Sequence, residues 1–122
     1  LNAIKQVAKR VNGKVEEKDF IAIGCEKIEN NRERKNCTNK KIIEFIQNDI
    51  KNPSPDIHGK VLYEITIDKK GKVTDVTVKE SNGVSKKQIK SGLKTLKKLP
   101  RFIPGYSGKK PVRVVFNLPI AF

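Results

Sequence analysis

The C-terminal stretch is the feature that most constrains the fold of this chain. From residue 112 to residue 120 apolar residues fall at every second position, and they are Val112, Val114, Phe116, Leu118 and Ile120. This alternation indicates a half-buried β-strand. Pro111 and Pro119 lie at its two ends, and proline has no N–H to give to a ladder, so the stretch suits the edge of a sheet. An edge strand must either be protected from unwanted pairing or serve as a docking site.

A β-hairpin and two helices are predicted before that strand. Residues 61–67 alternate clearly, residues 68–71 form a hairpin loop, and residues 73–79 form the return strand, with a bulge or a late start near Thr74. One helix begins at Thr38 or Asn39 and ends before Pro53. A second helix covers residues 85–99, where Ser85 and Gln88 form a capping box.

The N-terminal third is less regular. The apolar residues between positions 1 and 11 have the spacing of a short surface helix, unless they belong to a tail of what precedes them. Residues 15–23 are extended in character, and residues 26–36 are polar enough to predict a loop. We therefore expect a lead-in over residues 1–37 and a compact domain over residues 38–122.

The order of these elements predicts an α+β fold with two helices packed on one face of a three-stranded antiparallel sheet. Because the second helix carries the chain back, the last strand runs antiparallel to residues 61–67. The expected strand order is 2-1-3, with residues 61–67 in the middle. Residues 111–120 would then form an open edge.

Cys25 and Cys37 are the two cysteines of the chain. Zinc would need four ligands, and His58 is the single histidine, so a metal site is not expected. A disulfide explains the pair better; on the chain-entropy model it would contribute roughly 3 kcal/mol, and it would imply an oxidising compartment. Two separate buried thiols in a cytosolic protein are the alternative.

The net charge of +14 raises the question of nucleic-acid binding. The lysines are spread along the whole chain, which favours a solvated surface, with an acidic peptide, lipopolysaccharide or membrane surface as the alternative. The loop over residues 105–110 lacks the spacing of a P-loop and leads into a strand, unlike a KH loop. No specific nucleic-acid partner is therefore expected.

No catalytic set is evident, and neither an enzyme nor a cofactor is expected. His58 stands alone beside a strand entrance, while Asp68 and Asp75 flank the hairpin loop as turn residues. No apolar run approaches the ~20 residues of a membrane span. The chain begins with leucine, so we expect a processed or truncated sequence, and any anchor would lie outside it.

Several short motifs occur in order and with regular spacing in the second half of the chain. They are GKV at 59–61, IDKKGKVTDV at 67–76, SNG at 81–83, LPRFIPG at 99–105, GKKPV at 108–112 and LPIAF at 118–122. Together they resemble the C-terminal domain of TonB-family energy transducers over about residues 38–122. Upstream, GCEK at 24–27 and RERKNC at 32–37 resemble the cysteine-containing variety of Bacteroidetes TonB-like proteins, although Ile21-Ala22-Ile23 stands where that variety has prolines.

The resemblance implies a periplasmic, receptor-binding module that is anchored to the inner membrane in the full-length protein. Its expected partners are the TonB box of outer-membrane TonB-dependent receptors and, through the part that precedes this chain, ExbB/ExbD-like proteins. The implied activity is capture of the TonB box by strand addition and transmission of a proton-motive-force-derived pull for nutrient uptake. A TolA-like or stand-alone TonB-like periplasmic adaptor without energy transduction is the alternative. A homodimer of the isolated domain through free strands is left open.

The resemblance maps the docking strand onto residues 111–118. The expected partner-binding residues are Lys109, Lys110, Val112, Arg113, Val114, Val115, Phe116, Asn117 and Leu118. Within this set the apolar side chains Val112, Val114, Phe116 and Leu118 should hold the strand on the core. The backbone and the opposite-facing Arg113, Val115 and Asn117 should meet the partner, with the basic groups Lys109, Lys110 and Arg113 placed where an acidic peptide approaches. The alternative for these three basic groups is that they are solvated edge charges that discourage aggregation.

Overall fold

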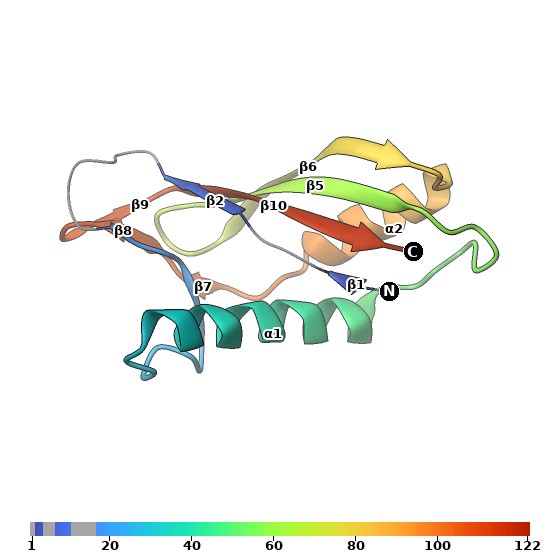
Figure 1. Ribbon diagram of the computed structural model, residues 1–122. Helices are drawn as coiled ribbons and strands as arrows, with labels where there is room; N and C mark the ends of the chain where they lie inside the picture. The colour runs from blue at the N-terminus through green and yellow to red at the C-terminus, as the bar shows by residue number, and fades with distance from the viewer. Residues whose placement is uncertain (1, 4–6, 11–16) are drawn as a thin grey trace.

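The structure, a computed structural model, describes residues 2–3, 7–10 and 17–122 and shows an α+β fold (Figure 1). Within these residues the main sheet has the order β1-β10-β5-β6, and β2 pairs with the same edge of β10 as β1. Its strands are β1 (Asn2–Ala3), β2 (Val7–Arg10), β5 (Lys60–Ile67), β6 (Val73–Asn82) and β10 (Val114–Ala121). The helices are α1 (Asn31–Asp49) and α2 (Lys86–Leu96).

Two small sheets extend the structure at one end. One has the order β3-β8-β9, and the other pairs β4 with β7. Their strands are β3 (Glu17–Lys18), β4 (Ile21–Ala22), β7 (Phe102–Ile103), β8 (Gly105–Ser107) and β9 (Lys110–Val112). The predicted strand 111–120 is therefore divided at Arg113, where the chain passes from the β8–β9 sheet into the main sheet.

The three predicted strands have the predicted order, because β5 lies between β6 and β10 and is antiparallel to both. The sheet is nevertheless wider than three strands. The prediction of a helix near the N-terminus is wrong for the described residues 2–3 and 7–10, which form β1 and β2. A short isolated helix is marginally stable in water, whereas β10 offers this segment a complete hydrogen-bonding partner.

The β5–β6 hairpin forms as its turn residues predict. The Asp68 carboxylate accepts hydrogen bonds from the backbone N–H groups of Lys70 and Lys72, at 2.8 and 2.9 Å. Gly71 has φ of +83°, which a glycine adopts without steric penalty. Ile67 pairs with Val73 and Thr66 with Asp75, so Thr74 is the bulged residue, as predicted.

Helix α2 begins with the predicted capping box. The Ser85 hydroxyl accepts from the backbone of Gln88 at 3.1 Å, and the Gln88 side chain accepts from the backbone of Ser85 at 2.9 Å. The buried amide of Gln88 also donates to the backbone oxygens of Ser54 and Ile57, at 3.0 and 2.8 Å. One side chain therefore caps α2 and fixes the segment that connects α1 to β5.

Helix α1 begins earlier than predicted. Asn30, rather than Thr38 or Asn39, is the N-cap, and its side chain accepts from the backbones of Arg32 and Glu33. The prediction of a loop over residues 26–36 is therefore wrong from residue 31 onward, since lysine, arginine and glutamate are good helix formers on a solvated surface. The helix also runs through the expected boundary between residues 37 and 38.

The segment before α1 is tied to the core at several points. Cys25 and Cys37 form the predicted disulfide, which joins the turn after β4 to α1. The Thr38 hydroxyl accepts from the backbone N–H of Ala22 at 3.1 Å. Phe20 stacks on Phe116 of β10, with ring centroids 4.8 Å apart. Residues 20–37 are therefore part of the folded unit.

The core lies between the helices and the inward face of the main sheet. Its largest fully buried side chains include Tyr63 of β5, Phe116 of β10, Ile42 and Ile46 of α1, and Leu96 of α2. Tyr63 donates to the backbone oxygen of Ile89 at 3.0 Å, and α2 comes this close to β5 because Gly92 has no side chain. A Cβ at Gly92 would overlap the Tyr63 hydroxyl.

We expect Gly92→Ala to lower the free energy of unfolding by about 1–3 kcal/mol, as overpacking of a filled core does. Denaturant unfolding followed by circular dichroism measures this change. The nearest atom to the added methyl is the Tyr63 hydroxyl oxygen, so the same substitution should cost less in a Tyr63→Phe background. An equal cost in both backgrounds would show that the ring of residue 63, whose Cζ lies 2.5 Å from the added Cβ, limits residue 92 and that the hydroxyl does not.

Candidate functional site

Strand β10 is held firmly along one edge. It pairs with β5 over its whole length, from Val114 opposite Ile67 to Ala121 opposite Lys60. Its inward side chains are buried as predicted, and they are Val114, Phe116, Leu118 and Ile120. The position of the β10 backbone is therefore set by the core and by β5.

The other edge of β10 already carries a strand. Residues 7–10 of β2 pair antiparallel with residues 114–117, with Lys9 opposite Val115 and Val7 opposite Asn117. Farther along, β1 pairs with Ile120 and Ala121. The prediction of an open C-terminal edge is thus wrong, because a segment from the N-terminal end of the chain runs along it (Figure 1).

The expected partner-binding residues lie in two different places. Val114, Val115, Phe116, Asn117 and Leu118 are on β10, beside β2, and Val115 and Asn117 are half-buried on the outward face. Lys110 and Val112 belong to β9, and Lys109 lies in the turn between β8 and β9. Arg113 stands between the two strands.

The basic side chains Lys109, Lys110 and Arg113 are all exposed. They lie on the β8–β9 hairpin and at the start of β10, beyond the end of the β2 pairing at Val114 and Arg10. The site therefore combines a strand edge with positive charge at one end of it.

The groups considered for other chemistry do not form a second site. His58 is exposed, with Nδ1 3.4 Å from the backbone oxygen of Phe122, and Asp68 is engaged by backbone N–H groups of its own turn. Across residues 2–3, 7–10 and 17–122 no group of three or more His, Cys, Asp or Glu side chains could hold a metal ion. Neither helix in this described part is long and apolar enough to cross a membrane.

Comparison with known proteins identifies the family. The model of the Gram-negative bacterial TonB protein C-terminal family matches residues 54–122, more than half of the chain. The chain belongs to the TonB C-terminal family. This family is periplasmic, non-enzymatic and associated with transport, and in general it interacts with outer-membrane receptors. No curated protein and no solved structure matches the chain.

The family match has a clear structural boundary. It begins after α1 and includes β5, β6, α2 and β10, the elements that form most of the main sheet and one of its helices. Strands β1 to β4 and helix α1 precede the matched TonB region. Sequence reasoning missed β2 as the neighbour of β10, because four residues, VAKR, do not show a clear alternation of apolar and polar positions.

Removal of residues 1–16 should expose the outer edge of β10. We expect hydrogen exchange of alternate backbone amides between Val114 and Asn117 to become at least about tenfold faster, because these groups lose their partners on β2. Amides of β5 and β6 serve as internal controls, since their ladder is unchanged. Unchanged exchange on β10, in a truncated protein that sedimentation shows to be monomeric, would contradict the pairing with β2.

Proposed function

We propose that this TonB-family domain captures the TonB box of outer-membrane TonB-dependent transporters by adding it as a strand to β10. It would then transmit a pull derived from the proton-motive force for nutrient uptake. ExbB- and ExbD-like inner-membrane proteins would supply that pull through the membrane-anchored part of the full-length protein. Membership of a family that interacts with outer-membrane receptors supports this proposal.

The observation that carries the proposal is the pairing of β10 with β2. An antiparallel strand with the unremarkable sequence VAKR lies against residues 114–117, so this edge accepts an added strand. Main-chain hydrogen bonds do not depend on side-chain identity, and one edge can therefore serve many receptors. Val115 and Asn117, half-buried on the outward face, would add a preference for particular side chains.

The pairing of β10 within the sheet suits a binding site that must resist a pulling force. The pairing of β10 with β5 over eight positions anchors the docking strand to the core. A pull along an added strand would load its hydrogen bonds together, so a small interface could withstand tension while binding weakly at equilibrium. The receptor peptide would replace β2, and the free energy of breaking the β2–β10 pairing would lower its affinity.

A reversible cross-link tests the location of the site. Lys9 and Val115 are directly opposed, so Lys9→Cys combined with Val115→Cys should allow a disulfide that locks β2 onto β10. We expect the locked protein to lose binding of synthetic TonB-box peptides, measured by chemical shifts of an isotope-labelled domain, and to regain it on reduction. The wild-type protein in the same reductant is the control for the native disulfide. Peptide binding to the locked form would place the site elsewhere.

Charge reversal at Arg113 tests the role of the basic end of the site. We expect Arg113→Glu to slow association with an acidic receptor peptide by about tenfold at low salt, with little change in dissociation. Stopped-flow fluorescence at several ionic strengths measures both rates. Lys86→Glu, at the start of α2 and near the opposite end of the sheet, makes the same change in net charge and should have a much smaller effect. If both substitutions slowed association equally, the overall charge of the protein would explain the change, and Arg113 would have no specific role.

A further inference from the structure

Acidic and basic residues are distributed unevenly along this chain. All 13 acidic residues lie between positions 16 and 80. Between positions 81 and 113 the chain has lysines and arginines but no aspartate or glutamate. Helix α2, with the sequence KKQIKSGLKTL, lies wholly within residues 81–113. Its polar surface therefore has no intrahelical ion pairs.

Three lysines of α2 and one lysine in the turn after it form a stripe. They are Lys87, Lys90, Lys94 and Lys98, which are separated by three, four and four positions, and all four are exposed. Like charges at these spacings repel one another along a helix. Lys94 and Lys98 suit the negative C-terminal end of the helix, but Lys87 lies in the first turn, where the dipole disfavours a cation. Helix stability alone does not explain the stripe.

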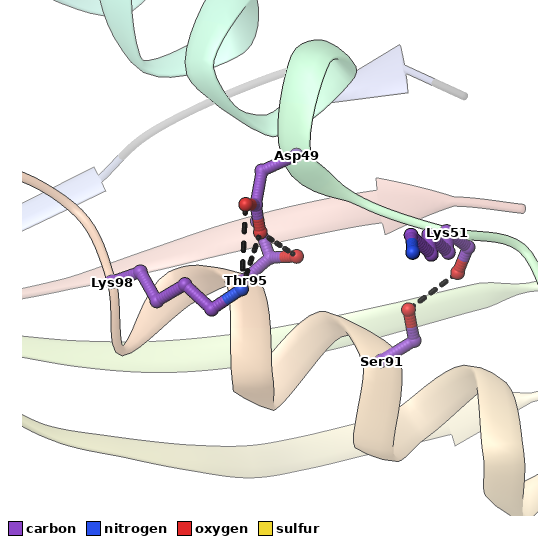
Figure 2. Close-up of polar contacts among 5 residues, drawn as sticks. All are labelled: Asp49, Lys51, Ser91, Thr95 and Lys98. Carbon is purple, nitrogen blue, oxygen red and sulfur yellow. Dashed lines mark hydrogen bonds and ion pairs between the residues drawn. The ribbon is translucent and has the colours of Figure 1, made fainter.

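The stripe forms one wall of a groove of about 510 Å³. The opposite wall consists of Asp49 at the end of α1 and of Lys51 and Pro53 in the segment that follows. The Ser91 hydroxyl donates to the backbone oxygen of Lys51, which joins the two walls (Figure 2). A concave site with five lysines is therefore held between two parts of the chain that are far apart in sequence.

Asp49 is the one carboxylate among the described residues that line the groove, and it already has partners. Thr95 donates to its Oδ2 at 2.8 Å, and Lys98 Nζ lies 3.4 Å from Oδ1 and Oδ2 (Figure 2). The Thr95 hydrogen bond, followed by Lys98, lowers the pKa of Asp49, so the carboxylate stays ionised at neutral pH. The Asp49 carboxylate neutralises the charge of Lys98. Lys51, Lys87 and Lys90 have no carboxylate partner within the described part of the chain.

We propose that this groove, which we call the α2 groove, binds an extended acidic segment of a partner protein. The stripe from Lys87 to Lys98 is about 16 Å long at the helical rise, enough for about five residues of an extended chain. Acidic residues at alternate positions of such a chain would lie about 7 Å apart on one side, close to the spacing of lysines on the helix.

The chemistry of the groove favours a peptide over a phosphate-rich surface or polymer. The ionised Asp49 could accept a hydrogen bond from a peptide N–H, a donor that a phosphate group does not offer. The apolar face of α2 is packed on the core, so the helix has no side chains free to insert into a bilayer. The α2 groove lies on the helical side of the sheet, and its occupation does not depend on strand addition at β10.

Fluorescence anisotropy with defined probes tests the proposal. The probe is a fluorescein-labelled peptide of alternating glutamate and serine, about twelve residues long, and its control has glutamine in place of glutamate. We expect the whole protein to bind only the glutamate peptide, with an affinity that falls as salt is added. Amide chemical shifts should change at Ser91 and Thr95. Shifts confined to other surfaces would overturn the proposal.

A pair of charge-matched variants separates the groove from the general positive charge. The triple variant Lys87→Gln, Lys90→Gln and Lys94→Gln should weaken binding by at least about tenfold. The control triple variant Lys27→Gln, Lys69→Gln and Lys70→Gln removes the same charge from exposed positions outside the groove and should change affinity less than about twofold. Thermal unfolding checks that both variants fold. Equal weakening by the two variants would overturn the proposal, as would groove-dependent binding to phosphatidylglycerol vesicles in the absence of peptide binding.

Discussion

The antiparallel pairing of β10 with β5 is the interaction on which the rest of the structure depends. Over eight positions it joins two strands whose inward side chains are all buried, so main-chain hydrogen bonds and core packing support each other. The α2 helix packs on this pair through Tyr63 and Gly92, and Phe20 stacks on Phe116. Because one edge of β10 is committed to β5, its other edge must either stay unpaired or take another strand.

The N-terminal segments determine whether the outer edge of β10 is open or paired. The disulfide between Cys25 and Cys37 and the contact of Thr38 with Ala22 fix the segment before α1 against the core. Strands β1 and β2 lie still farther upstream and pair with the edge of β10 that is proposed to take a receptor peptide. The protein thus has within its own chain an example of the interaction proposed for its partner.

The predictable part of this structure is local. The alternation of residues 61–67, the turn at Asp68, the bulge at Thr74 and the capping box at Ser85 depend on neighbouring residues, and the structure confirms them. The start of α1 was missed because a polar helix on a solvated surface lacks an apolar period where it is not packed. The α2 groove was missed because its walls are far apart in sequence.

Short stretches of the sequence were enough to predict the class of the fold, the order of the hairpin and last strand, and the family, because they carry the periodicity, turn chemistry and motifs. The pairing of the outer edge of β10, in contrast, comes from contacts between segments at opposite ends of the chain. That outcome depends on which distant segment reaches the unpaired N–H and C=O groups of β10. A four-residue strand such as β2 is too short to show a strand pattern in its sequence, and its conformation depends on pairing with β10.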